Sequence, residues 1–366
     1  MRLLLLLLLI GFASACKNDK YPDLTDGLYA EIATDKGDIL INLDFENVPV
    51  TTANFVSLSE GTNPYVSKNY EGKPFFNGLT FHRVESNFMI QGGDPMANGL
   101  GGPGYKFENE HPKKNDSLDL YYFDKPGVVA MANAGRDTNG SQFFITHVEY
   151  PSINGGYSIF GHVSQGQEVV DQIVVGDVMK KVSIIRVGKK ATQFDATSVF
   201  ATYFKGLEEK TKLKNEAIAA ARQQFLEKVE TNRAQSKELA SGLKMIITDE
   251  GSGVKPKKGV TVRINCSGYF TDGNLFYTTY KEKAEEFGKY NQATEDQGYY
   301  NPFSMPYSEE ATLVPGFREG MLNMNYGDKA LLYIPSYLGY GSQGNGPIPP
   351  NTDLIFEIEL VNEQGE

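Results

Sequence analysis

Hydrophobic and polar residues alternate, or form short apolar runs, through the first part of the chain. Residues 28–33 and 38–43 show this pattern on either side of a polar turn at 35–37, which predicts two antiparallel β-strands. Residues 48–58 instead place apolar side chains on one side at helical spacing, and Gly61 follows where a helix would end. Short strands then recur between glycine-rich loops, so this region is predicted to be a closed β-barrel capped by helices.

The pattern changes near residue 190. Residues 197–239 contain one Gly, no Pro and many Lys, Glu, Ala and Gln residues. Apolar residues fall at helical spacings in this stretch: Phe200, Phe204, Leu207, Ile218, Ala221, Phe225 and Val229. The stretch predicts a long helix or a helical hairpin that is closed by Gly242. Its simplest role is a spacer. Alternatively, it packs against a partner helix in the same chain or in a second copy, which would allow self-association through residues 197–239.

Composition narrows the class of protein. A chain of 366 residues with 40% hydrophobic and 12% aromatic residues predicts two or three folded domains. The formal net charge of −11 argues against nucleic-acid binding, which needs a basic surface. The four histidines form no metal-ligand spacing. A glycine pattern at 99–104 lacks the strand and helix of a nucleotide site, so it is assigned to a loop. We expect no metal and no cofactor.

The N-terminus predicts export. Arg2 precedes an apolar run at 3–12 and the sequence Ala-Ser-Ala-Cys ending at Cys16, which is typical of a signal peptide over residues 1–15. The run is too short to anchor the chain across a bilayer. Cys16 after small residues resembles a bacterial lipobox, although Leu is missing three positions earlier; the alternative is a plain cleaved signal. Lipidated Cys16 would begin a tether over residues 16–26, and Lys17 favours the outer membrane, facing the periplasm of a Gram-negative cell envelope.

The only other cysteine is Cys266. If Cys16 carries lipid, no disulfide can form. Cys266 ends the alternating stretch 262–266, so we expect a buried and unreactive thiol.

Two separated motifs carry the chemistry of the first part. Residues 81–94 read FHRVESNFMIQGGD, and residues 131–145 read MANAGRDTNGSQFFI. In order and spacing they resemble the cyclophilins, a family of peptidyl-prolyl cis/trans isomerases, and the resemblance covers residues 27–189.

The resemblance implies a role for each motif residue. Arg83 would donate to the prolyl nitrogen, whose lone pair returns when the peptide bond twists, so this contact would be stronger in the transition state than in the planar ground state. The residues expected to form the proline pocket are Phe88, Met89, Phe144 and Ile153. Gln91 and Asn133 would hold the substrate backbone. On the alternative interpretation, Arg83 is a surface cation and the apolar residues are ordinary core.

Two positions depart from the cyclophilin pattern. Tyr157 stands where many members have His, a change that bacterial members often share. Ser152 stands where many members have Trp, which donates a hydrogen bond to cyclosporin, so we expect weak binding of that drug.

The last part resembles the FKBPs, a second isomerase family, over residues 242–364. The matching segments are KGVTVRI at 258–264, GYFTDGNLF at 268–276, LVPGFREG at 313–320, IPSYLGYG at 334–341 and IPPNTDLIF at 348–356. The resemblance implies an α+β fold in which an antiparallel sheet wraps on a short helix. It also implies a pocket formed by Phe276, Tyr277, Val314, Phe317, Tyr340, Ile348 and Phe356.

The FKBP match is partial at the pocket. Phe317 replaces the usual Trp, Cys266 the usual Tyr, and Tyr277 the usual Asp. The segment 278–312 is longer than in the family, and within it Phe303 could contribute to the pocket. We therefore expect weak catalysis, or peptide binding alone, from this domain.

The predicted organisation is a signal at 1–15, a tether at 16–26, a cyclophilin-type domain at 27–189, a helical linker at 190–241 and an FKBP-type domain at 242–366. Two functions compete. In the first, the protein isomerises prolyl bonds in unfolded or flexible exported polypeptides, with the first domain as main catalyst. In the second, it is a membrane-tethered, chaperone-like binding protein or scaffold whose isomerase activity is incidental.

Overall fold

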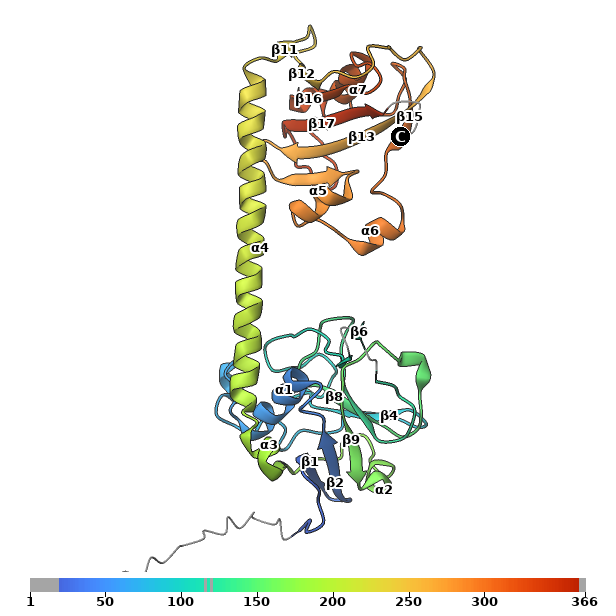
Figure 1. Cartoon of the computed structure of the whole chain (residues 1–366). Helices are drawn as coiled ribbons and strands as arrows, with labels where there is room; N and C mark the ends of the chain where they lie inside the picture. Colours follow the sequence, from blue (N-terminus) through green and yellow to red (C-terminus); the bar gives the residue numbers. More distant parts are fainter. Residues whose placement is uncertain (1–19, 115–116, 119–120, 362–366) are drawn as a thin grey trace, which may run out of the picture. The chain divides into compact units, whose positions relative to one another are not determined.

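The computed structural model describes residues 20–114, 117–118 and 121–361. Two compact units divide at residues 207 and 208, inside a long helix (Figure 1). The predicted signal peptide and Cys16 lie outside the described residues.

The first unit is built on one antiparallel sheet of eight strands in the order β10-β1-β2-β9-β7-β8-β4-β3. Its strands are β1 (Gly27–Thr34), β2 (Gly37–Leu43), β3 (Arg83–Glu85), β4 (Met89–Gly92), β7 (Val128–Met131), β8 (Phe143–Thr146), β9 (Ile159–Gln165) and β10 (Lys181–Val187). A separate two-stranded ribbon is formed by β5 (Lys113–Lys114) and β6 (Ser117–Leu118). The predicted hairpin is confirmed as β1 and β2.

Short helices complete the first unit: α1 (Pro49–Glu60), α2 (Gln167–Val170), α3 (Gly188–Gln193) and the 3-10 turns η1 (Lys68–Tyr70) and η2 (Pro151–Ile153). Helix α1 ends as predicted, since Gly61 takes the left-handed conformation and donates its N–H to the last turn. The expectation of a one-sided helix is wrong, because residues 51–59 are all buried. This helix lies in the core of the first unit, where Phe55 stacks on Phe76, a residue of the segment after η1, with ring centroids 4.9 Å apart.

Helix α4 (Ala196–Arg233) is one uninterrupted helix of 38 residues, so the alternative of a helical hairpin is wrong. It ends six residues before the predicted end, and the short strand β11 (Lys237–Glu238) precedes Gly242. Despite its length, α4 is too polar to cross a bilayer, and no other helix within the described residues could do so.

The two ends of α4 belong to different cores. Phe200 is buried in the first unit, where Phe204 packs on Tyr65 with ring centroids 4.3 Å apart. In the second unit Phe225 stacks on Tyr269 at 3.7 Å, and the Tyr333 hydroxyl donates to the Val229 carbonyl at 2.6 Å. The apolar stripe that suggested a partner helix is therefore covered largely by the sheets and loops of the same chain.

The second unit contains a seven-stranded antiparallel sheet in the order β11-β12-β16-β17-β13-β14, with β15 also paired to β13. Besides β11 its strands are β12 (Lys244–Asp249), β13 (Thr261–Phe270), β14 (Leu275–Thr278), β15 (Phe303–Pro306), β16 (Lys329–Ile334) and β17 (Leu354–Val361). The helices are α5 (Lys281–Glu286), α6 (Gln292–Asp296), α7 (Pro315–Leu322) and the 3-10 turn η3 (Ser336–Leu338). The long segment after β14 thus supplies α5, α6 and β15.

Both faces of this second sheet are buried. On strand β16, Leu332 and Ile334 pack toward Phe317 of α7, while Leu331 and Tyr333 pack toward α4. Successive residues of a strand point to opposite faces, which explains the split. The predicted sheet on a short helix is present, and α4 covers its other face.

Candidate functional site

A polar pocket of about 470 Å³ lies at the edge of the first sheet where β3, β4 and β8 meet. Seven of the residues predicted for the first site line it: Arg83, Phe88, Met89, Gln91, Asn133, Phe144 and Tyr157. The eighth, Ile153, packs on the same apolar cluster but does not line the cavity. Two motifs that are fifty residues apart in the sequence therefore form one site.

Strand pairing places the polar side of this pocket. Arg83 lies directly opposite Gln91 in the β3–β4 ladder, and its Nη1 donates to Gln91 Oε1 at 2.9 Å. Gln91 Nε2 in turn donates to Gln142 Oε1 at 2.8 Å. Gln142 then donates to the carbonyls of Gly99 and Gly101, at 3.0 and 2.9 Å. The guanidinium is thus the start of a hydrogen-bonded chain that reaches the 94–101 loop.

Asp94 holds that loop in place. Its carboxylate accepts the backbone N–H groups of Met96, Asn98 and Gly99 at 2.6 to 3.0 Å. Burial alone would raise the pKa of Asp94, but these hydrogen bonds lower it below its ordinary value. The loop that contains the 99–104 glycine pattern is therefore a fixed wall of the pocket, as the sequence assignment to a loop predicted.

The apolar side of the pocket is an aromatic cluster. Phe144 and Met89 are buried, and Tyr157 meets Phe144 edge-on at 5.3 Å between ring centroids. Phe123 stacks beneath Phe144 at 5.7 Å. Packed rings of this kind give a rigid surface on which a flat aliphatic ring can be buried.

Arg83 is the only charged side chain among the described residues that line this pocket. Burial lowers the pKa of the neighbouring His82, which keeps its ring neutral near pH 7. Arg83 itself is 47% exposed, so its remaining N–H groups can reach a ligand.

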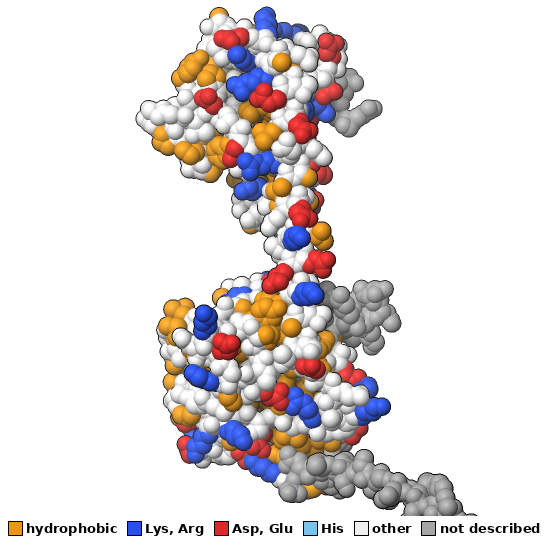
Figure 2. Space-filling view, turned by 90° about the vertical axis from the view of Figure 1, so that its left-hand side faces the viewer, with side chains coloured by type: hydrophobic (Ala, Val, Ile, Leu, Met, Phe, Trp, Pro, Cys, Tyr) orange, Lys and Arg blue, Asp and Glu red, His pale blue; other side chains and the backbone are white. Residues whose placement is uncertain are grey.

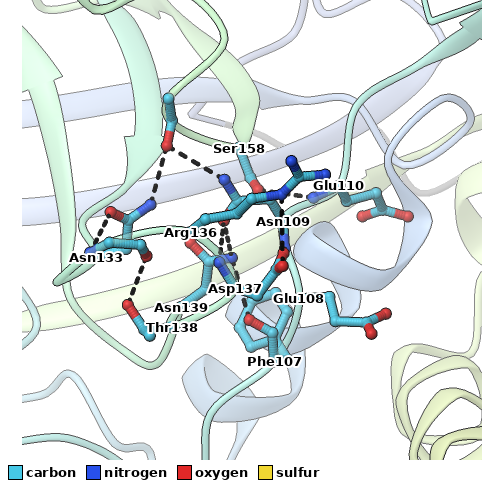
Figure 3. A network of polar contacts seen from close by, with 12 residues as sticks. Phe107, Glu108, Asn109, Glu110, Asn133, Arg136, Asp137, Thr138, Asn139 and Ser158 are labelled. Atoms are coloured by element: carbon cyan, nitrogen blue, oxygen red, sulfur yellow. Dashed lines mark hydrogen bonds and ion pairs between the residues drawn. The ribbon is translucent and has the colours of Figure 1, made fainter. Parts of the chain in front are cut away.

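Asn133 is already engaged within the protein. Its Nδ2 donates to the Gly156 carbonyl at 3.1 Å, and its Oδ1 accepts the Gly135 N–H at 3.2 Å (Figure 3). Asn109 joins the same loops, since its Nδ2 also donates to Gly156 and its backbone N–H donates to Asp137. This network, which the sequence reasoning missed, holds Asn133 and the segment before Tyr157 together.

Two more residues beside the pocket were missed. Gln142 and Glu85 both lie inside the quoted motifs, and Glu85 accepts a hydrogen bond from Arg83. A polar residue two positions from a candidate cation on one strand was the signal available for Glu85.

A second pocket of about 610 Å³ lies in the second unit, between β13, β14, α7 and the loop before β17. All seven predicted residues line it, and so do Cys266 and Phe303. Phe356 meets Phe317 and Phe276 edge-on at 5.2 and 5.7 Å. Among its described lining residues none carries a charge. Burial raises the pKa of the Cys266 thiol to about 12 and that of the Tyr277 hydroxyl to about 12, so both are neutral near pH 7.

Within the described ranges, His, Cys, Asp and Glu side chains form no group of three that could hold a metal ion. The side chains named above offer hydrogen bonding and apolar burial at both pockets, and the first pocket adds the permanent cation Arg83.

Comparison with known proteins agrees with both halves of this description. Residues 29–189 match the family model of cyclophilin-type peptidyl-prolyl cis-trans isomerases, and residues 252–361 match that of FKBP-type peptidyl-prolyl cis-trans isomerases. A probable peptidyl-prolyl cis-trans isomerase A of Mycobacterium leprae is 51% identical over 150 residues, which are 39% of this chain and 79% of that protein. Peptidyl-prolyl cis-trans isomerase B of Streptomyces anulatus is 46% identical over 156 residues, 41% of this chain and 85% of its own. An isomerase of Helicobacter pylori is 38% identical over 168 residues, 44% of this chain and 90% of its own.

The fold and the similarity to these relatives define the first unit as a cyclophilin-type domain, and a domain of FKBP type follows it. The chain belongs to the family of cyclophilin-type peptidyl-prolyl cis-trans isomerases and is an enzyme of that class, acting on proline-containing polypeptides.

Proposed function

We propose that the first pocket is the main catalyst and that Arg83 is its electrophile. The observation that carries this proposal is that one permanent cation lines the same pocket as the buried side chains of Met89 and Phe144. A proline ring packed on that wall would bring its nitrogen toward the guanidinium. Gln91 and Asn133, on the polar side, would contact the substrate backbone.

The catalytic effect follows from charge. In the planar peptide bond the nitrogen lone pair is delocalised, and twisting the bond restores it. A donor aimed at this nitrogen therefore binds the twisted state more strongly than the ground state, which lowers the barrier.

Peptide binding can be located directly. A prolyl tetrapeptide added to the whole protein should first perturb the NMR methyl signal of Met89, and only at higher concentration that of Ile348 in the second pocket. Perturbation confined to Ile348 would contradict the assignment of the first pocket as the main site.

We propose that the FKBP-type domain, residues 242–366, is a weak isomerase or a peptide-binding module. Its aromatic pocket can bury a proline ring, but among its described lining residues there is no charged donor for the twisted state.

We also propose that the first domain, 27–189, forms a closed barrel. An antiparallel bridge between Thr80 and Val178, just before β3 and β10, supports closure between the ends of the strand order.

We propose that the protein acts on exported polypeptides from a lipid anchor at Cys16, on the periplasmic side of the outer membrane. The support is the sequence of residues 1–16 alone. Replacing Cys16 with Ser should move the protein from the membrane fraction to the soluble fraction. Unchanged pelleting in high salt would count against a lipid tether.

A second candidate function is chaperone-like binding, which the uncharged second pocket favours because it offers apolar burial without catalysis. An aggregation-suppression assay beside an isomerase assay separates the two functions. A Tyr340→Ala variant should lose the suppression of aggregation and keep the isomerase activity.

Self-association through residues 197–239 would have to use side chains other than the buried Phe200, Phe225 and Val229. Light scattering of the mature chain tests it.

A further inference from the structure

Glu85 shares a strand face with Arg83. The two residues are two positions apart in β3, so their side chains point to the same side. Arg83 Nη2 donates to Glu85 Oε1 at 2.5 Å, while Nη1 donates to Gln91 at 2.9 Å. The two terminal nitrogens of the guanidinium are thus each held by a different strand, β3 on one side and β4 on the other.

We propose that Glu85 is a positioning residue that holds the Arg83 guanidinium in the orientation required at the prolyl nitrogen. The proposal rests on the proposed role of Arg83. Glu85 is not among the residues that line the pocket, so it acts through Arg83 rather than on the substrate.

The reason for a second anchor is the exposure of Arg83. A long side chain that is 47% exposed has many rotamers available in water. One hydrogen bond to Gln91 leaves the guanidinium free to rotate about that contact. A second bond to Glu85 fixes its plane, which a planar, multi-donor group needs if one N–H is to point at a single atom.

A carboxylate beside the cation could also act in the opposite direction, by neutralising the charge that stabilises the twisted bond. Both side chains are about half exposed, 47% for Arg83 and 49% for Glu85. Water screens the Coulombic effect of such a pair strongly. The effect of Glu85 on the orientation of the guanidinium should therefore outweigh its partial neutralisation of the Arg83 charge. Removing Glu85 should slow the enzyme.

The two effects are separable by substitution. Glu85→Gln keeps an acceptor oxygen at the same reach and removes the charge, whereas Glu85→Ala removes both. Met89 lies opposite Glu85 in the ladder and is held by its own buried cluster, so truncation at 85 leaves the apolar wall in place. Glu46→Ala is a matched control, because it breaks an exposed ion pair with Lys190 at 2.6 Å outside the pocket.

The experiment measures kcat and KM of the whole protein on a prolyl tetrapeptide. For Glu85→Ala we expect kcat to fall about two- to fivefold, the range of an exposed ion pair, with KM changed by less than about twofold. Glu85→Gln and Glu46→Ala should stay near the wild-type values. In an Arg83→Ala background, Glu85→Ala should cause no further loss, because its effect passes through the guanidinium.

Three results would overturn the proposal: faster turnover in Glu85→Ala, equal losses in Glu85→Gln and Glu85→Ala, or an equal loss in the Arg83→Ala background. If Arg83→Ala is slow while Glu85→Ala matches wild type, only the positioning role fails. If Arg83→Ala itself is as active as wild type, the proposed function fails and the positioning role fails with it.

Discussion

The two pockets of this chain differ most in charge. The first places one permanent cation, Arg83, against an aromatic wall, with Gln91 beside it. The second is lined by six aromatic side chains and, among its described lining residues, by no charged group. Both offer apolar side chains on which a proline ring could be buried, but among the described lining residues only the first pocket has a charged donor, Arg83, which we propose binds the twisted bond more strongly than the planar one. On the proposed roles of the two pockets, binding a proline ring needs only apolar side chains, whereas the first pocket adds a cation for catalysis.

On the face shown in Figure 2, the two units carry similar mixtures of charged side chains. Figure 2 shows Lys, Arg, Asp and Glu side chains interspersed over both units, without a large area of one sign on the face in view.

The largest expected effect concerns Cys266, because a thiolate there would give the second pocket a charge. Burial raises the pKa of this thiol from 9.0 to about 12. Since the thiolate is the reactive form, alkylation by iodoacetamide at pH 8 should be about a thousand times slower than for a free cysteine. The Cys16→Ser variant, which leaves one thiol, is the protein to use. The same variant unfolded in guanidinium should react at the ordinary rate; fast alkylation of the folded form would break the comparison.

The next effect concerns Arg83. Replacing it with Ala should lower kcat/KM on a prolyl tetrapeptide about a hundredfold, the size of one charge-assisted contact made chiefly in the transition state. The loss should fall on kcat more than on KM, since Met89 and Phe144 still bind the ring. Tyr340→Ala, the matched change in the second pocket, should keep more than about half of the activity. A large loss in Tyr340→Ala with little loss in Arg83→Ala would reverse the roles of the two domains.

The sequence predicted those features that depend on neighbouring residues, such as a hairpin and the end of a helix. The β1–β2 hairpin followed from alternation on either side of a polar turn, although Gly37, predicted in the turn, pairs with Thr34 as the first residue of β2. The left-handed Gly61 ended α1 as expected. The residues of both pockets could be assigned because the order of the motifs aligns residues such as Arg83 and Phe144 with positions of the cyclophilin family. Hydrophobic periodicity alone does not provide this alignment.

Contacts between distant segments could not be predicted in this way. Burial of α1 on every side depends on segments that surround it in space, and its own spacing carries no sign of them. The narrow apolar stripe of α4 was compatible with packing against a second copy of the chain. The sequence of the helix does not reveal that its partners are Tyr269 and Tyr333, on strands that come later in the chain. Ile153 was expected in the proline pocket, yet at the end of the 3-10 turn η2 it packs on the apolar cluster without lining the pocket.

The smallest expected effect separates the two units by acid sensitivity. All four histidines of the chain, His82, His111, His147 and His162, lie in the first unit. Burial lowers the pKa of three of them, His82, His111 and His162, below the ordinary 6.5. The unfolded chain therefore takes up protons before the folded chain as the pH falls below 6.5. This proton uptake lowers the free energy of the unfolded chain more than that of the folded chain, so the free energy of unfolding of the first unit decreases.

Each such histidine contributes up to about 1.4 kcal/mol per pH unit below 6.5. Burial also raises the pKa of Glu110, which opposes this trend in the first unit, so a single-residue variant is the sharper test. His162→Gln should flatten the dependence of the first unit's unfolding free energy between pH 7.5 and 5.5, measured by calorimetry or urea titration. The second unit, which has no histidine, should show no change with this variant. An unchanged slope in His162→Gln would mean that the ring of His162 is protonated in the folded protein as readily as in the unfolded chain.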